Sequence, residues 1–145
     1  MMIEIKTQIA IQAPPEKIWQ VLTNFAHYPA WNPLIKDISG NLQIGQKLQV
    51  TIQPPGQKAM RFKPQLLAVQ PAQKLAWKGK LLFPGLLDGE HIFELFPQSD
   101  GSTLFVHREK FTGILVRIAL KSSATNIQQG FEQMNQQLKL RCEGC

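Results

Sequence analysis

Three ionisable side chains alternate with apolar residues in two stretches of this sequence. His91 begins one stretch, and His107 and Glu109 lie two positions apart between phenylalanines in the other. Alternation with a period of two is typical of strands, in which every second side chain points to the same face. The apolar residues place that face toward the core, so the three ionisable groups are expected to point inward. A turn at Ser99-Asp100-Gly101 would set His91 opposite His107 or Glu109, about 5 Å away.

These three residues are the candidate catalytic or ligand-orienting groups, and three interpretations of them are open. A buried carboxylate beside two imidazoles can share a proton with them and orient a hydroxyl or carbonyl group of a ligand. Alternatively, the three groups only satisfy one another inside the protein or face water at the mouth of a cavity. Two histidines and a glutamate could also bind a metal ion, but no close ligand spacing indicates such a site. Neither a metal nor a cofactor is therefore expected.

Large aromatic residues in the same region are suited to the lining of an apolar cavity. Binding pockets are mostly apolar with a few polar groups, but aromatic side chains dominate protein cores in any case. Cavity lining and ordinary core packing are both open for each of these residues. They are Phe62, Trp77, Phe83, Phe93 and Phe105.

The elements that must position these residues are mostly strands. Residues 2–12 alternate between isoleucines and polar residues, which predicts a first strand. Ala13-Pro14-Pro15 ends it, and a short helix over Glu16 to Thr23 follows, because proline is tolerated in a first helical turn. The prolines in Asn24 to Leu34 confine a second helix to about one turn, in a corner packed with aromatic residues. From Ile35 to about Phe111, turn residues separate six further strands that are too closely spaced for parallel crossovers.

The period becomes helical after Thr112-Gly113 and stays so to the end of the chain. A helix of about twenty-five residues would span about 40 Å, long enough to cross the sheet. Its segment Lys121 to Asn126 holds small and polar residues where bulky apolar ones are expected. A ligand cavity beneath this turn, bounded by Ile118, Ser122 and Asn126, is one interpretation. A poorly buried first half of the helix is the other.

The loop Leu81 to Leu87 carries five large apolar residues around a Pro-Gly turn, more than a solvated loop needs. One interpretation is a lid, or a tip in transient contact with a membrane, beside the cavity entrance. The other is a loop that packs on the long helix.

The composition argues against several classes of protein. With 145 residues, 43% of them hydrophobic and 18% charged, the chain is expected to fold as a single domain over residues 1–145. No apolar run reaches the length of a membrane span, and both cysteines, Cys142 and Cys145, lie in a tail that is expected to fray. A cytoplasmic protein is expected. The net charge of +6 comes from scattered lysines and arginines without a dense basic run, which argues against nucleic-acid binding.

Several motifs together resemble the SRPBCC superfamily, whose members share the START-like, helix-grip fold. These motifs are Ala13-Pro14 with Glu16, Ile18-Trp19, Tyr28-Pro29, Trp31-Asn32-Pro33, Phe83-Pro84-Gly85-Leu86, Asp88-Gly89-Glu90-His91, the strand Phe105 to Gly113, and Gly130 to Asn135. The later ones resemble the polyketide cyclase/dehydrase-like branch. The resemblance implies an α+β helix-grip fold like that of START domains and the birch-pollen allergen. In that fold a seven-stranded curved antiparallel sheet packs on a long C-terminal helix, in the order strand, two short helices, six strands, helix.

A fold shared by so many proteins leaves three functional hypotheses. The leading one is binding of a small hydrophobic molecule, such as a lipid, an isoprenoid or a polyketide-like compound, in a cavity between the sheet and the C-terminal helix. The second, which the resemblance alone implies, is an enzyme of the polyketide cyclase, aromatase or dehydratase type, in which a histidine or glutamate moves protons. The third is a protein-interaction module that uses the basic surface.

Overall fold

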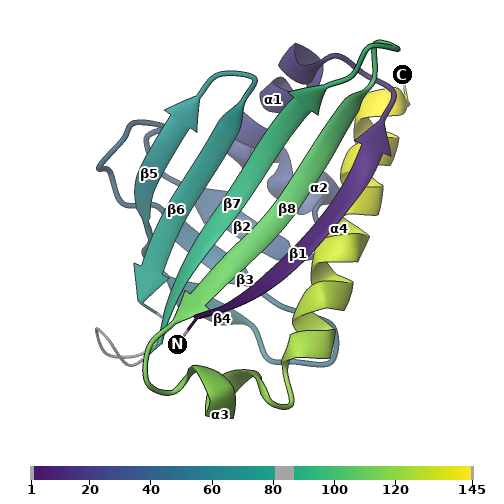
Figure 1. The fold of residues 1–145 in the computed structure, drawn as a ribbon. Coiled ribbons are helices and arrows are strands. Elements are labelled where there is room, and N and C mark those ends of the chain that lie inside the picture. Colours follow the sequence, from purple (N-terminus) through teal and green to yellow (C-terminus); the bar gives the residue numbers. More distant parts are fainter. Residues whose placement is uncertain (1, 81–86, 145) are drawn as a thin grey trace.

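A five-stranded antiparallel sheet forms one side of the molecule (Figure 1). The structure, a computed structural model, describes residues 2–80 and 87–144. The strands follow the order β1-β8-β7-β6-β5, so the first and the last strand of the chain are neighbours. Their bounds are β1 Met2–Ile11, β5 Gln65–Gln70, β6 Lys74–Lys80, β7 Asp88–Pro97 and β8 Thr103–Thr112.

A second, three-stranded sheet lies behind the first in the order β2-β3-β4 (Figure 1). Its strands are β2 Ile35–Ser39, β3 Gln49–Ile52 and β4 Met60–Phe62. Backbone hydrogen bonds join the two sheets, from Leu48 N to Pro64 O at 2.8 Å and from Leu66 N to Gln46 O at 2.9 Å. The two sheets therefore form one continuous wall around the core.

The prediction of a single seven-stranded sheet is wrong in its count, because the described residues form eight strands in two sheets. The strand that the sequence pattern does not reveal is β5. Its run Leu66-Leu67-Ala68-Val69 shows no period of two in the sequence, because Leu67 is apolar although it is 43% exposed. A bulge between Leu66 and Ala68 also shifts the pairing with β6. Pro64, which has no N–H to donate, separates β5 from β4.

Two short helices close one end of the core, as the prolines predict. α1 Pro15–Thr23 begins with proline in its first turn, and a 3-10 turn, η1 Phe25–His27, leads into α2 Tyr28–Trp31. The Tyr28 hydroxyl is fully buried and donates a hydrogen bond to the backbone oxygen of Leu22 at 2.6 Å. Burial raises the pKa of Tyr28. The packed aromatic corner predicted for this segment is confirmed.

The C-terminal helical segment is broken, which corrects the prediction of one continuous helix. α3 Val116–Leu120 ends at the turn of residues 121–123, and α4 Ala124–Glu143 follows with 20 residues. Serine side chains compete with a helix for backbone hydrogen bonds, which favours the break at Ser122-Ser123. In Figure 1, α4 runs beside β1 along one edge of the five-stranded sheet, and α3 lies across the end where the chain begins.

α4 approaches the second sheet closely at Gly130. A Cβ atom at this position would lie 2.8 Å from Leu34 Cδ1 and 3.3 Å from Pro55 Cδ. Glycine therefore allows Leu34 and the Pro54-Pro55 turn to pack directly on the helix. This contact helps to build one wall of the cavity described below.

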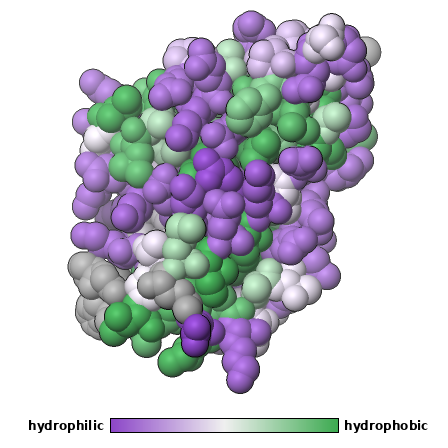
Figure 2. Space-filling model, viewed as in Figure 1, coloured by the Kyte–Doolittle hydropathy of each residue, from purple (hydrophilic) through white to green (hydrophobic). Residues whose placement is uncertain are grey.

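The outer face of the five-stranded sheet is mainly polar. Figure 2 shows hydrophilic residues across the middle of this face, with hydrophobic residues gathered above and below them. Arg108 lies there between two carboxylates, with N–O distances of 3.0 Å to Glu4 and 2.8 Å to Glu94. These ion pairs lie on the solvent side of the sheet. The candidate site must therefore be built from side chains on the inner face.

Candidate functional site

Alternation in β7 and β8 directs three ionisable side chains into the molecule, as the sequence predicts. His91, His107 and Glu109 are buried, with exposures of 1%, 0% and 8%. In the pairing of the two strands, His91 lies opposite Glu109 and Phe93 lies opposite His107. His107 is thus a diagonal neighbour of His91 on the same face, within reach of its ring.

The structure brings the three candidate residues into contact. His91 Nε2 lies 2.7 Å from His107 Nε2, the distance of a short hydrogen bond. His91 Nδ1 lies 3.4 Å from Glu109 Oε1. Among the described residues, His91 Nδ1 has no hydrogen-bond partner at well-formed geometry. Among the described residues, the Glu109 carboxyl group is therefore the nearby side chain with which this nitrogen could share a proton.

Two further residues, which the sequence patterns did not reveal, complete the site. Asn135 of α4 contacts His107 Nδ1 through Oδ1 at 2.8 Å, and its Nδ2 donates to Thr7 Oγ1 at 2.8 Å. Thr7 of β1 in turn donates to the backbone oxygen of His107 at 3.0 Å. We call these five residues, Thr7, His91, His107, Glu109 and Asn135, the polar cluster.

A sequence signal for both added residues exists. Thr7 is the polar residue on the face of β1 that otherwise carries isoleucines. Asn135 lies four residues after Phe131 and three before Leu138, on the buried face of α4. A polar residue on an apolar face needs a buried hydrogen-bond partner. This rule predicts the pairing of a strand residue with a helix residue but not which two residues pair.

Aromatic rings enclose the two imidazoles of the polar cluster. Phe131 of α4 stacks on His107 with the ring centroids 4.0 Å apart, and Trp77 of β6 stacks on His91 at 5.3 Å. Burial holds the pKa of His107 well below its usual range, the neighbouring His91 adds to this shift, and the hydrogen bond with Asn135 opposes it. His107 is therefore neutral near pH 7.

An apolar cavity of about 280 Å³ lies beside the polar cluster, between the sheets and the C-terminal helices. Glu109 is the ionisable residue on its wall among the residues that the structure describes. The lining consists of Leu34, Ile52, Pro54, Gln57, Met60, Phe62, Leu87, Glu109, Phe111, Ala119, Leu120, Ser123, Ile127 and Phe131. The polar cluster thus opens to a guest molecule at Glu109.

The predicted lining residues of the sheet fall into two groups. Phe62 and Glu109 line the cavity. The others pack in the core away from its wall and are almost fully buried: Trp77, His91, Phe93, Phe105 and His107. For these aromatic residues, core packing is the interpretation that agrees with the structure.

The loop predicted over Leu81 to Leu87 is described only at its last residue. Leu87 is buried and lines the cavity, which agrees with inward packing at that position. Residues 81–86, including Phe83, lie outside the described residues. Transient membrane contact by this loop stays a prediction.

The C-terminal helices line the cavity with different residues from those predicted, which corrects the expectation for Ile118, Ser122 and Asn126. Ile118 is 75% exposed, Ser122 is exposed, and Asn126 is half-buried without lining the cavity. The helical residues that line it are Ala119, Leu120, Ser123, Ile127 and Phe131. The turn between α3 and α4 interrupts the helix. The spacing of buried residues in α4 therefore does not predict which residues of α3 are buried.

Cys142 is buried in the core instead of lying in a frayed tail, because α4 continues to Glu143. Desolvation raises the pKa of its thiol to about 11. Such a thiol is unreactive near neutral pH. Cys145, its predicted neighbour in the tail, lies outside the described residues.

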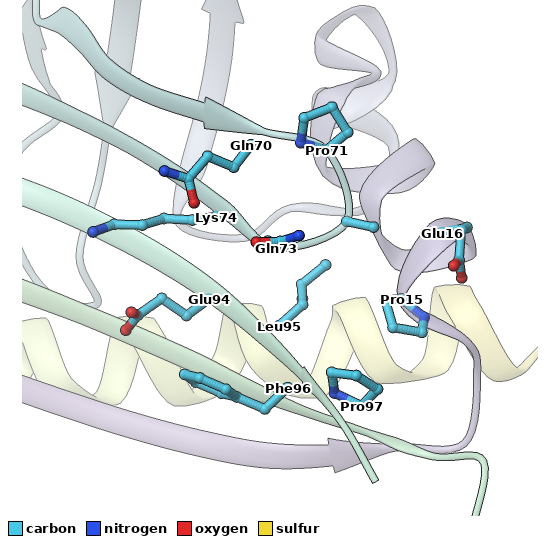
Figure 3. A pocket seen from close by; sticks show the side chains of 11 residues that line it. Pro15, Glu16, Gln70, Pro71, Gln73, Lys74, Glu94, Leu95, Phe96 and Pro97 are labelled. Carbon is cyan, nitrogen blue, oxygen red and sulfur yellow. The ribbon is translucent and has the colours of Figure 1, made fainter.

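A larger hollow of about 610 Å³ lies at the opposite end of the sheet, where the turn between β5 and β6 faces the start of α1 (Figure 3). Much of its rim consists of exposed side chains, among them Glu16, Gln70 and Phe96. Lys74 and Glu94 extend along one side of it in Figure 3. Polar contacts in such a solvated hollow are weak, so the apolar cavity at Glu109 is the better candidate site.

Metal-ligating clusters and membrane-spanning helices are both absent from residues 2–80 and 87–144. In these ranges no group of three His, Cys, Asp or Glu side chains could hold a metal ion. Nor does any helix there combine the length and the apolar character that crossing a bilayer requires.

A family model described as polyketide cyclase/dehydrase and lipid transport matches residues 2–143. The chain belongs to this family. The match confirms the resemblance to the SRPBCC superfamily that the sequence motifs indicate. No curated protein sequence matches the chain.

Several solved structures share the fold of this chain. The Zhui aromatase/cyclase from Streptomyces sp. R1128 has a TM-score of 0.77 at 14% identity, over 99% of this chain and 94% of that chain. Protein TTHA0849 from Thermus thermophilus has a TM-score of 0.74 at 14% identity, over 97% of both chains. Ara h 8.0201 has a TM-score of 0.64 at 17% identity, over 95% of this chain and 98% of that chain. Identities this low show the α+β helix-grip fold alone.

Proposed function

We propose that this protein binds one small, mostly apolar molecule in the cavity beside the polar cluster. The observation that carries the proposal is an apolar cavity with a single ionisable residue, Glu109, among the described residues of its wall. Pockets for small molecules combine these two features. Phe62, Phe111 and Phe131 supply apolar surface to the ligand, and Glu109 supplies its polar contact.

The volume of the cavity limits the size of the ligand. About 280 Å³ is the liquid volume of about nine water molecules at roughly 30 Å³ each. A two-ring compound or a short isoprenoid of about ten non-hydrogen atoms has this size. A two-chain lipid is too large, so the lipid hypothesis narrows to small single-chain or cyclic molecules.

Burial of apolar surface drives the binding. A two-ring aromatic group buries roughly 200 Å², which contributes about 5 kcal/mol at about 25 cal/mol per Å², before the cost of association. We therefore expect a simple hydrocarbon to bind weakly, with a dissociation constant on the order of a millimolar.

Tetralin, a two-ring hydrocarbon, tests the proposal when it is titrated into isotope-labelled protein and followed by NMR. Amide shifts near Phe111 and Ile127 should change and saturate. Ala119→Trp fills the cavity and should abolish this binding, whereas Ile118→Trp on the exposed side of α3 is the matched control and should not. Equal binding to both variants, or no saturable binding to the unaltered protein, contradicts the proposal.

A proton-transferring enzyme is the second candidate function. The family includes cyclases and dehydrases by its description, and the Zhui protein is named an aromatase/cyclase. The observation that favours this function is the Glu109 carboxyl group, which lies on the cavity wall beside His91 and could exchange a proton with a bound carbonyl compound. If a small β-diketone is turned over, Glu109→Gln should lower kcat at least about a hundredfold with little change in KM. If mass spectrometry detects no product, the enzyme function is contradicted and only the binding function remains.

A further inference from the structure

We infer that the cavity selects a neutral apolar molecule that carries a hydroxyl group, and that this hydroxyl donates a hydrogen bond to Glu109. The inference rests on the proposed function, because it names the class of ligand for the same cavity. Its basis is the direction of the hydrogen bonds in the polar cluster, which can be followed from Thr7 to the cavity wall.

The direction is set at Thr7. Its hydroxyl donates to the backbone oxygen of His107, so its single proton is already used. Toward Asn135, Thr7 Oγ1 can therefore only accept a hydrogen bond, and the group that faces it at 2.8 Å must be the Asn135 Nδ2 amine. This orientation turns the amide oxygen Oδ1 of Asn135 toward His107.

The orientation of the Asn135 amide determines which nitrogen of each histidine carries a proton. Asn135 Oδ1 carries no proton, so His107 Nδ1, 2.8 Å away, must be the donor. A buried, neutral imidazole that is protonated on Nδ1 has a lone pair on Nε2. His91 Nε2, 2.7 Å from that lone pair, must then be a donor as well.

The last step places a proton between His91 and Glu109. With its Nε2 protonated, a neutral His91 would point a lone pair from Nδ1 at Glu109 Oε1, 3.4 Å away. If Glu109 were ionised, lone pairs of His91 Nδ1 and Glu109 Oε1 would face each other and repel. The proton between them belongs either to a carboxyl O–H or to an imidazolium N–H, and in both arrangements the pair has no net charge.

The second carboxyl oxygen of Glu109 is left as an acceptor. Oε1 faces His91, and the strand neighbour on the other side is Ile5, which has no polar side-chain atom. A ligand hydroxyl in the cavity can donate to the second oxygen. A ketone oxygen cannot, and a protonated amine would bring an uncompensated charge into an apolar cavity.

Four probes with one carbon skeleton test this selection: 2-tetralol, tetralin, 2-tetralone and 2-aminotetralin. In NMR titrations, 2-tetralol should bind about fivefold to tenfold more tightly than tetralin. The ketone and the amine should bind more weakly than tetralin. If none of the four binds, the proposed function itself fails. If tetralin binds and the ketone or the amine binds as tightly as the alcohol, only the present inference is overturned.

Two substitutions test whether Glu109 acts as a hydrogen-bond acceptor or through its charge. Leucine removes both properties, whereas glutamine keeps an acceptor oxygen and removes only the ionisable group. Glu109→Leu should lower the affinity for 2-tetralol about fivefold to tenfold, to the level of tetralin. Glu109→Gln should restore the preference, because its amide N–H can donate to His91 Nδ1 and its oxygen can accept from the ligand. A preference for the alcohol that persists in Glu109→Leu, or that fails to return in Glu109→Gln, would overturn the inference.

The proton positions can be read independently of any ligand. Long-range nitrogen–proton NMR spectra distinguish the two tautomers of neutral histidine, and the chain has three histidines, of which His27 is exposed and serves as a reference. His107 should be protonated on Nδ1 and His91 on Nε2. The opposite tautomer of His107 would reverse the direction of the cluster and contradict the inference.

Discussion

The space between the five-stranded sheet and α4 has two ends that are packed differently. Toward the C-terminus of α4, Met134, Leu138 and Cys142 are fully buried, where the helix contacts α1 and β1. Toward its N-terminus, Ala124 and Ile127 are only half-buried and the cavity begins. We call these the closed end and the open end. The polar cluster lies at the boundary between them.

The two ends differ in the side chains that cover the helix. α1 brings the large residues Ile18 and Leu22 to the closed end, and both are completely buried. At the open end, the short α3 and the turn after it contribute small residues, Ala119 and Ser123, to the wall. The same sheet and helix therefore give a solid core at one end and room for a guest at the other. Stability and binding should consequently respond to different substitutions.

The largest expected effect is the loss of packing at the closed end. Leu138→Ala should lower the free energy of unfolding by about 3 kcal/mol, because it removes buried methyl groups and leaves a cavity. Ile127→Ala, at the open end, should cost about 1 kcal/mol, since that side chain is already half-exposed beside empty space. Urea denaturation measures both. A larger loss at Ile127 than at Leu138 would show that the two ends do not differ as described.

At the boundary, removal of the Asn135 amide should have an intermediate effect. Asn135→Leu leaves the buried N–H of His107 without a partner, which should cost about 2 kcal/mol. Gln136→Leu, at the exposed neighbouring position, is the control and should change stability by less than about 0.5 kcal/mol. A double-mutant cycle with Thr7→Val should show a coupling energy of about 1 kcal/mol. No coupling would mean that the cluster does not act as one unit.

The most gradual effect should be a pH dependence of stability that arises from His107. Its pKa is well below 6.5 in the folded protein, whereas it returns to about that value on unfolding. Below about pH 6.5 the unfolded chain therefore binds a proton that the folded protein does not. The free energy of unfolding should fall by up to about 1.4 kcal/mol per pH unit as the pH decreases toward the folded pKa.

Urea unfolding between pH 5 and pH 7 measures this dependence, over a range in which most carboxylates stay ionised. His107→Phe should flatten the profile, and His27→Gln, which removes an exposed histidine, should leave it unchanged. Equal slopes for the unaltered protein and His107→Phe would assign the dependence to another group.

The inner face of the site could be predicted from the sequence because alternation is a local property of a strand. Phenylalanines on both sides of His107 and Glu109 fix which way these residues point, and the structure agrees. The phase of the C-terminal helices could not be predicted in this way. Ile118 fits the apolar face of α4 only if the helix is continuous, and the turn of residues 121–123 interrupts it.

Pairings between distant segments were also beyond local patterns. The bulge in β5 is a shift in its pairing with β6, so the sequence of β5 alone does not show it. Thr7 and Asn135 each stand out as polar residues on apolar faces, but their hydrogen bond joins positions 128 residues apart. Periodicity within one element carries no information on which distant element it meets.

The pairing of β1 with β8 also affects how the chain is made. Met2 pairs with Thr112 and Ile11 pairs with Thr103, so β1 lies at the edge of the sheet and finds its partner strand about a hundred residues later. At about 5 to 20 residues per second, a ribosome needs roughly five to twenty seconds to synthesise that interval. During this time the first strand leaves the ribosome without its partner. The five-stranded sheet can close only after β8 has emerged from the exit tunnel.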